Sequence, residues 1–256
     1  MEVPPQKRSK LFHHLKKWLE KAIIDYAMIS KGDRVLLAFS GGADSHALLD
    51  LMMAKMVFVP PFELIACHID NGFDESLEGY QKIEEYFRYR NILFVMEKTD
   101  FGRLAHSDYN FKKSACFLCS RLRRKRLFEI AAANNCNKIA LGHHRDDVVE
   151  TLILNMFYSR EISTMVPNQP LFGGTLNIIR PFFYIREELV KKFAVECAFP
   201  IIANPCPTAP ISRRAYIKNL LQELETENRA IRNNIFKSLS HVRVEYLIGE
   251  KNGEQG

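Results

Sequence analysis

Residues 35–45, with the sequence VLLAFSGGADS, constrain the fold of this chain more than any other stretch. Five apolar residues have the length of a short buried strand, the Gly-rich turn 40–45 follows, and residues 46–56 show a helical pattern. A strand, a Gly-rich turn and a helix N-terminus form an anion site, because backbone N–H groups and the positive helix end point at one place. The alternative is an ordinary strand–helix turn with Asp44 as the helix N-cap, but such a turn would not require this combination of Ser, Gly and Asp.

Short apolar segments and helical segments alternate along the rest of the chain. The expected strands are 62–69, 92–96 and 138–141, and the expected helices are 7–29, 76–90, 119–135, 147–158, 186–198 and 212–224. Residues 99–113 and 159–180 are expected to be irregular. This alternation indicates an α/β fold, a parallel twisted sheet with helices on both faces. Right-handed crossovers then bring the turns 40–45, 70–72 and 142–147 to one carboxyl edge of the sheet, where α/β proteins bind ligands.

Bulk composition indicates a single globular body and favours a polyanionic partner. The chain has 256 residues, 47% of them hydrophobic, and its 36 Lys and Arg exceed its 30 Asp and Glu. No apolar run approaches the roughly 18 residues of a membrane span, and the N-terminus lacks the apolar core of a signal peptide. We therefore expect a cytoplasmic protein without membrane contact. Three regions are expected: an N-terminal helix over 1–30, a catalytic domain over 31–225, and a C-terminal helix with a disordered tail over 226–256.

Six cysteines in such a chain indicate reduced thiols or metal ligands. Cys116 and Cys119 form a CxxC pair just before an expected helix, and Cys206 lies on a Pro-rich loop. The other three, Cys67, Cys136 and Cys197, are expected to serve packing. Three thiolates would need a histidine, His143 or His144, to complete a zinc site, whereas an iron–sulfur cube on three cysteines keeps one iron open. Residue types alone leave both metals open.

A second acidic turn, GHHRDDVVE over 142–150, opens the expected helix 147–158. Asp147 as N-cap with Glu150 three residues later would form a capping box. Asp146 or Asp147, together with Asp44, also has the chemistry to hold Mg²⁺ between phosphate oxygens. Both roles are compatible.

The turn SGGxDS resembles the PP-loop of the N-type ATP pyrophosphatases, which cleave ATP to AMP and pyrophosphate. CFLCSRLRR over 116–124, GHHRDD over 142–147, Arg180-Pro181 and Cys206 resemble one branch, the tRNA 2-thiocytidine synthetases (the TtcA family), over about residues 30–215. The resemblance implies an adenine nucleotide alpha hydrolase-like, Rossmann-like PP-loop fold. It also implies ATP-dependent thiolation of cytidine 32 in the tRNA anticodon loop. Ala43 stands where the family usually has Lys, and Pro207-Thr208 where it has Gly-Ser.

The resemblance also implies the cofactors, the partners and the site residues. ATP, Mg²⁺ and a [4Fe-4S] cluster are the expected cofactors, with the cluster on Cys116, Cys119 and Cys206. These cysteines and the acids Asp44 and Asp147 are the expected catalytic residues, and Asp146 joins the two acids at magnesium. The expected nucleotide contacts are Ser40, Gly41, Gly42, Asp44, Ser45, Asp70, Gly142 and His143. The expected RNA contacts are Arg121, Arg123, Arg124, Arg126, Arg213 and Arg214. The expected partners are tRNA and a sulfur donor such as a cysteine desulfurase, and a homodimer is compatible.

Two alternatives remain at this point. One is another tRNA-modifying PP-loop enzyme of the lysidine or 2-thiouridine type. Lysidine synthetases would not need the CxxC pair, and 2-thiouridine thiolases would add flanking zinc fingers, whereas no cysteine precedes Cys67. The other is a non-catalytic regulator that binds ATP or an iron–sulfur cluster. A decayed enzyme would not need to keep Asp44, Asp146 and Asp147 together.

Overall fold

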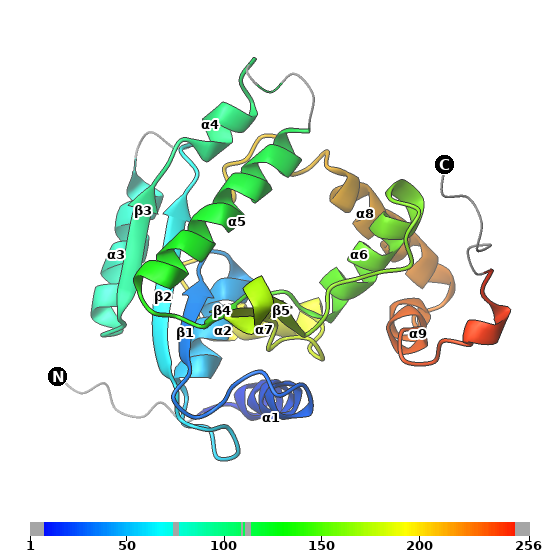
Figure 1. The fold of residues 1–256 in the computed structure, drawn as a ribbon, viewed down its shortest axis with the longest axis horizontal. Coiled ribbons are helices and arrows are strands. Elements are labelled where there is room, and N and C mark those ends of the chain that lie inside the picture. Colours follow the sequence, from blue (N-terminus) through cyan, green and yellow to red (C-terminus); the bar gives the residue numbers. More distant parts are fainter. Residues whose placement is uncertain (1–7, 74–76, 109, 111–113, 249–256) are drawn as a thin grey trace.

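A computed structural model describes residues 8–73, 77–108, 110 and 114–248, and a six-stranded sheet is the main element of this described part (Figure 1). The strands are β1 Arg34–Ala38, β2 Glu63–Asp70, β3 Phe94–Lys98, β4 Lys138–Ala140, β5 Asn168–Leu171 and β6 Leu176–Ile179. They lie in the order β3-β2-β1-β4-β6-β5, and every neighbouring pair is parallel except β5 and β6. The expected α/β fold with a mainly parallel sheet is confirmed.

Strand β1 lies inside the sheet, between β2 and β4. Val35, Leu36 and Leu37 have no exposed surface, so both faces of the strand are covered, as the continuous apolar run predicts. The chain leaves β1 toward β2 and β3 on one side and reaches β4 and β6 on the other. This reversal of strand order at β1 and β4 opens a crevice at their carboxyl ends.

Helices cover both faces of the sheet. On one face lie α1 Lys10–Asp25, α2 Ala43–Met53, α3 Glu78–Tyr89 and α7 Glu187–Glu196, and on the other lies α5 Ala115–Ala133. The side chains of β1 alternate between these layers: Leu37 packs with α1 and α2, whereas Leu36 packs with Leu127 and Ile130 of α5. Helix α1 lies within the expected helix 7–29, and its Leu15 and Leu19 are buried in the same core as the sheet.

Three helices form a second packing unit beside the carboxyl edge. They are α6 Arg145–Tyr158, α8 Arg213–Glu227 and α9 Ile231–Ser238, followed by the short 3-10 helix η2 Val244–Tyr246. Val149 of α6 packs against Ile217 and Leu221 of α8. Figure 1 shows α5 and the α6–α8 pair standing apart, with the segment before α8 crossing from near the start of α5.

The expectation of a loop over residues 159–180 is wrong, because this segment contains β5 and β6. Pro170 is tolerated because β5 is the antiparallel edge strand of the sheet. The short 3-10 helix η1 Phe172–Gly174 joins the two strands, with positive φ values of 67° at Gly173 and 90° at Gly174. The Gly and Pro residues therefore mark a hairpin and an edge, not a long loop.

Other element bounds also differ from expectation. Helix α4 Phe101–Ala105 lies in the segment 99–113 that was expected to be irregular. Helix α5 begins at Ala115, four residues earlier than expected, so the CxxC pair lies inside the helix rather than before it. The predicted helix starts at residues 7 and 76 and the end of the predicted tail lie outside the described residues. Within the described chain, no helix combines the length and the apolarity that a membrane crossing requires.

Candidate active site

The serine hydroxyl groups of the Gly-rich turn after β1 form hydrogen bonds within the turn. Ser45 Oγ donates to the Gly42 carbonyl at 2.9 Å, and Ser40 Oγ accepts from the Gly42 N–H at 3.3 Å. Gly42 is the N-cap of α2, so the first-turn N–H groups of this helix face the crevice at the carboxyl edge. Gly41 has a φ of 83°, and a Cβ there would lie 3.2 Å from Ile83, so glycine is required. This is the backbone of a phosphate site.

The segment before α8 is attached directly to this turn. The Ile202 N–H donates to the Gly41 carbonyl at 3.0 Å, and the Ile202 side chain packs against Gly41. Four residues later the same segment carries Cys206. The bond therefore fixes the distal cysteine segment beside the predicted nucleotide site.

The acidic turn after β4 has a capping box, but three residues earlier than predicted. His144 is the N-cap of α6: its Nδ1 accepts from the Asp147 N–H at 3.3 Å, and the Asp147 carboxylate accepts from the His144 N–H at 2.9 Å. The predicted box of Asp147 with Glu150 is therefore wrong, because the helix already begins at Arg145. As a result, Asp147 lies in the first turn of α6 and stays next to the crevice.

The carboxylate of Asp44 lies between other acids at the start of α2. Burial raises the pKa of Asp44, His144 and Lys191 oppose this rise, and Asp147 and Glu187 add to it. Within the described residues, no hydrogen bond or ion pair engages this carboxylate. Gly142 approaches the backbone of Asp44 closely, since a Cβ at Gly142 would lie 3.3 Å from the carbonyl carbon and from the Cβ of Asp44. A half-buried carboxylate beside further acids is suited to a bound divalent cation.

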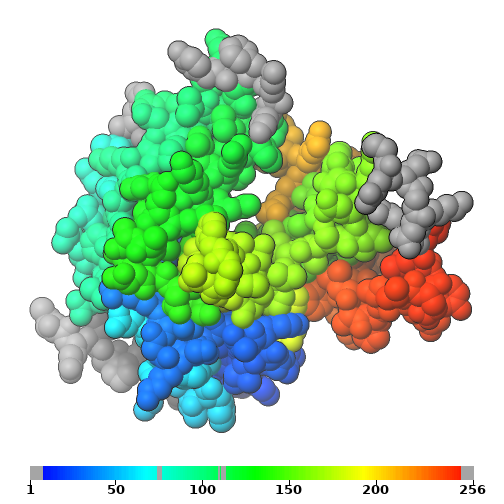
Figure 2. Space-filling model, viewed as in Figure 1, coloured from blue at the N-terminus to red at the C-terminus, as the bar shows by residue number. Residues whose placement is uncertain are grey.

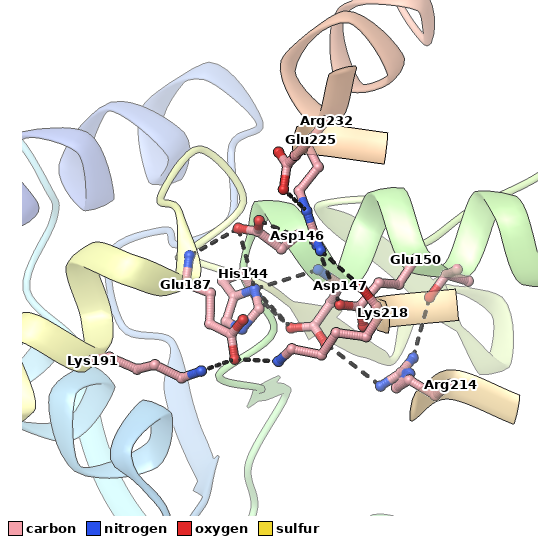
Figure 3. A network of polar contacts seen from close by, with 11 residues as sticks. His144, Asp146, Asp147, Glu150, Glu187, Lys191, Arg214, Lys218, Glu225 and Arg232 are labelled. Atoms are coloured by element: carbon pink, nitrogen blue, oxygen red, sulfur yellow. Dashed lines mark hydrogen bonds and ion pairs between the residues drawn. The ribbon is translucent and has the colours of Figure 1, made fainter. Parts of the chain in front are cut away.

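Asp146, unlike Asp44, already has partners (Figure 3). Its Oδ2 accepts from the Glu187 N–H at 2.8 Å, at the start of α7, and its Oδ1 lies 3.6 Å from Arg232 of α9. Arg232 also lies 3.5 Å from Glu150 and donates to Glu225 at 2.8 Å. Asp146 therefore joins three helices, and its contacts favour an anchoring role over a magnesium contact.

Replacing Arg232 with Met is expected to destabilise the protein by about 3 kcal/mol, because Asp146 and Glu150 would stay buried without their cation. Burial raises the pKa of Glu150, so this carboxyl is among the first to become neutral as the pH falls. The loss of unfolding free energy caused by Arg232→Met should therefore be smaller at low pH. Urea denaturation across pH would measure it, with Arg229→Met, at an exposed position, as the control. Equal losses for both variants would contradict the assigned contacts.

Lysines and Arg214 complete the same network (Figure 3). Burial raises the pKa of Glu187, but hydrogen bonds from Lys191 and Lys218 outweigh it and hold the pKa at about 2. Arg214, predicted as an RNA contact, lies 3.5 Å from Asp147 and donates to Thr151 at 3.2 Å. It therefore faces the acidic turn.

Two basic side chains near Asp147, those of His143 and Arg180, are not paired with a full opposite charge within the part of the chain that the structure describes. Burial, helped by Arg180 and Arg214 and opposed by Asp147, lowers the pKa of His143 to about 4, so the imidazole is neutral at pH 7. Arg180 follows β6 and is 6% exposed, and it donates to the Val166 carbonyl at 2.5 Å. Burial, followed by Arg124, lowers the pKa of Arg180 to about 10. A guanidinium without a carboxylate within 4 Å among the described residues favours an anionic ligand nearby.

Asp70 ends β2 at the same edge of the sheet. Its carboxylate accepts from the Gly72 N–H at 2.9 Å, and this tight turn needs glycine because a Cβ would lie 2.4 Å from the Thr99 carbonyl oxygen. Asp70, Lys98 and Arg103 are among the residues that line a polar cavity of about 370 Å³. A larger apolar cavity of about 490 Å³ lies at the opposite, amino ends of β2 and β3, so it is remote from the turns described above.

The three predicted ligand cysteines converge from two segments. Cys116 and Cys119 lie one turn apart in the first turns of α5, and Cys206 lies on the segment attached to Gly41. Cys116 Sγ is 3.6 Å and Cys206 Sγ 3.4 Å from the Thr208 hydroxyl oxygen, so the two sulfurs are at most 7.0 Å apart. Burial raises the pKa of Cys119, Arg123 opposes it, and the nearby Cys206 and Cys116 add to the rise.

This set fits a cluster better than a single ion. No group of three His, Cys, Asp or Glu side chains in the described part of the chain is close enough to hold one metal ion. All six cysteines are free. Two of the three sulfurs lie around one hydroxyl and the third lies near both, which matches the donor set of an iron–sulfur cube, a group wider than one ion. Cys67 and Cys136 are buried as expected, but the packing role predicted for Cys197 is wrong, because it is the exposed C-cap of α7.

The predicted RNA-contacting arginines separate into two groups. Arg126 donates to Glu97 at 2.8 Å and to Glu129 at 2.7 Å, so it is already paired. Arg121, Arg123 and Arg124 are exposed on α5 and form no ion pair with a described residue. Arg213 of α8 lies 4.5 Å above the ring of Tyr158. Figure 2 shows a hollow between the surface of α5 and the surfaces of α6 and α8.

The fold and the Gly-rich turn define the class of this protein. The PP-loop domain family matches residues 9–225, so this is a PP-loop protein. The tRNA-cytidine(32) 2-sulfurtransferase of Geotalea uraniireducens (strain Rf4) is 35% identical over 247 residues, which are 94% of this chain and 96% of that protein. That of Paraburkholderia phytofirmans (strain DSM 17436 / LMG 22146 / PsJN) is 36% identical over 248 residues, 95% of this chain and 72% of that protein. The chain belongs to the tRNA-cytidine(32) 2-sulfurtransferase family.

A solved structure supports the fold. The U34-tRNA thiolase NcsA from Methanococcus maripaludis, determined with its [4Fe-4S] cluster, superposes with a TM-score of 0.74 at 20% identity. The match covers 94% of this chain and 81% of that chain. The likeness shows a shared PP-loop fold.

Proposed function

We propose that this chain is an ATP-dependent tRNA sulfurtransferase that replaces the 2-oxygen of cytidine 32 with sulfur, the activity for which its relatives are named. The observation that carries the proposal is the attachment of the distal cysteine segment to the nucleotide turn. Through the Ile202–Gly41 bond, an anion site and three grouped thiols belong to one crevice. A lysidine-type enzyme would have no use for this group of thiols.

The first step would activate the base. The cytosine 2-oxygen bonds to the α-phosphorus of ATP, and pyrophosphate leaves. The turn 40–45 and the N-terminus of α2 would bind the leaving pyrophosphate, with Asp44 and Asp147 holding Mg²⁺ against it. Arg214 and the neutral His143 beside Asp147 would orient the phosphate oxygens. Asp70, at the polar cavity after β2, would contact the nucleoside.

The second step would replace oxygen by sulfur. A sulfur atom at the hydrosulfide level bonds to carbon 2 of the activated base and loses its proton, the bond from carbon 2 to the phosphate oxygen breaks, and AMP leaves with that oxygen. The cluster, when bound, would supply the site from which sulfur is transferred. A donor such as a cysteine desulfurase would deliver the sulfur as a persulfide, and a thiol reductant would supply the two electrons that release it as hydrosulfide. Cys116, Cys119 and Cys206 would hold the cluster at the open end of the crevice. Unpaired thiols of this kind persist in a reducing compartment, which supports a cytoplasmic location.

The hollow between α5 and the α6–α8 pair would receive the anticodon arm. Arg121 and Arg124 on one side have the charge to contact phosphates. Tyr158 on the other side is 43% exposed and Phe157 55% exposed, which is suited to stacking unpaired bases. An anticodon loop can present an unstacked base at small cost, so cytidine 32 can enter the crevice.

The test of function is the nucleoside content of tRNA. A strain that lacks this chain should lose 2-thiocytidine at position 32 and regain it on complementation. Retention of 2-thiocytidine in the deletion strain would contradict the proposal. Loss of 2-thiouridine or lysidine instead would assign the chain to another branch of PP-loop tRNA enzymes.

The double variant Arg121→Gln with Arg124→Gln is expected to weaken tRNA binding and to flatten its salt dependence. Each lost phosphate contact should reduce the slope of log affinity against log salt by about 0.9 for a duplex. ATP binding should not change. Arg126→Gln is the matched control, because Glu97 and Glu129 already neutralise Arg126. Equal slopes for the double variant and the wild type would show that this face of α5 is only solvated.

A further inference from the structure

The hydroxyl of Thr208 lies within hydrogen-bond distance of two of the ligand cysteines, Cys116 and Cys206. Besides the two sulfurs, its oxygen lies 3.2 Å from Nε2 of His106. His106 is the C-cap of α4 and is 102 residues away in sequence. Three segments therefore meet at one oxygen atom: the end of α4, the first turn of α5, and the segment that carries Cys206 and Thr208.

The histidine is fixed in position and in tautomer. Nδ1 of His106 lies 2.9 Å from the Gly102 carbonyl, which can only accept, so Nδ1 carries the hydrogen. In the neutral ring Nε2 is then an acceptor, and the Thr208 hydroxyl donates to it. The ring also makes an edge contact with Phe73 at 5.3 Å, and a Cβ at Gly102 would lie 2.4 Å from the Phe73 ring. Packing against the turn after β2 therefore fixes the position of the His106 ring.

The hydroxyl has different partners in the thiol and thiolate states of the cysteines. As thiols, Cys116 and Cys206 can each donate S–H to the Thr208 oxygen. Ligand cysteines are thiolates and have lost that hydrogen, so an oxygen lone pair would then face two negative sulfurs. The hydroxyl avoids this repulsion by turning its hydrogen from His106 to a sulfur. Such a bond withdraws electron density from the sulfur and stabilises the reduced state of a bound cluster.

We propose that Thr208 is a positioning residue of the iron–sulfur site, whose hydroxyl donates to a ligand cysteinate and raises the reduction potential of the cluster, whereas His106 competes with the sulfur for the same hydrogen. The inference rests on the proposed function, because it assumes a cluster on Cys116, Cys119 and Cys206. It assigns roles to two residues outside the predicted site.

The test measures the reduction potential of the anaerobically prepared holoprotein. Thr208→Val keeps the shape and removes the donor, so the potential should shift to a more negative value while iron and sulfide contents stay at the wild-type level. Thr208→Ser restores the hydroxyl and should return the potential to that of the wild type. An unchanged potential in Thr208→Val would overturn the proposal.

His106→Ala tests whether the histidine and the sulfur compete for the Thr208 hydrogen. Loss of the competing acceptor should leave the potential equal to that of the wild type or more positive, and it should have no effect in the Thr208→Val background, because His106 reaches the sulfurs only through the hydroxyl. A more negative potential in His106→Ala, or a further shift in the double variant, would overturn this competition. If Thr208→Val prevents cluster assembly, iron content decides: retention by Thr208→Ser supports the hydroxyl role, and loss in both variants overturns it. Wild-type protein without iron would overturn the proposed cluster function itself, which is a separate outcome.

Discussion

Asp44→Asn is expected to abolish ATP-dependent release of AMP and pyrophosphate, with a loss of at least ~10²-fold in kcat/KM. The variant keeps the shape of the side chain and removes the charge proposed to hold Mg²⁺. Its stability should be equal to or greater than that of the wild type at pH 7. Burial and the neighbouring acids raise the pKa of Asp44, so in the absence of a cation the ionised form destabilises the fold. Pyrophosphate release and thermal unfolding, each with and without Mg²⁺, measure both effects.

Asp25→Asn is the matched control for this change. Asp25 is the last residue of α1, and its carboxylate pairs with Lys21 and accepts from the Tyr184 hydroxyl, so it makes no contact with the described turns of the crevice. It should keep full activity. Stabilisation by Mg²⁺ and ATP should be present in the wild type and this control and absent in Asp44→Asn. Undiminished AMP release by Asp44→Asn would remove Asp44 from the metal site.

Cys116→Ala and Cys206→Ala are each expected to lose the cluster and all tRNA thiolation. Anaerobically prepared wild type should contain iron and sulfide at about four each per chain. Removing one of three ligands leaves two, which cannot hold the cube. ATP binding should persist in both variants, because the turn 40–45 keeps its own hydrogen bonds.

Cys197→Ala provides the comparison. Cys197 is the exposed C-cap of α7 and belongs to neither of the two segments that carry the ligand cysteines. Its loss should change neither iron content nor thiolation. Stoichiometric zinc without iron in the anaerobic wild-type protein would overturn the cluster assignment, whichever variants remain active.

The fold was predictable where periodicity is strong and one element buries a whole face. The apolar run of β1 and the alternation of strands and helices predict the parallel sheet and its carboxyl edge. Strands β5 and β6 were missed because four residues carry too little alternation to separate a strand from a loop. The pairing of β6 with β4, and of β5 with β6, depends on packing across the sheet, which no local pattern records.

The sequence predicts which turns form the candidate site, but it does not predict the contacts between their side chains. The Gly-rich turn, the acidic turn and the ligand cysteines could be found because their residue types are unusual at that spacing. Arg232 and His106 give no such signal, since a single arginine or histidine is common on any helix. Their partners are far away in sequence, so only the folded chain brings them together. The paired state of Arg126 escaped detection for the same reason.

Helix α9 determines where a working fragment of this protein can end. The PP-loop match stops at residue 225, and a fragment cut there would keep the whole of that family match. It would lack Arg232, the side chain that neutralises Asp146 and Glu150 from outside the matched range. Those two carboxylates also lie beside the proposed metal acids. A minimal catalytic fragment must therefore include residues through α9, and the part of the chain that appears to be an appendage carries a charge on which the crevice depends.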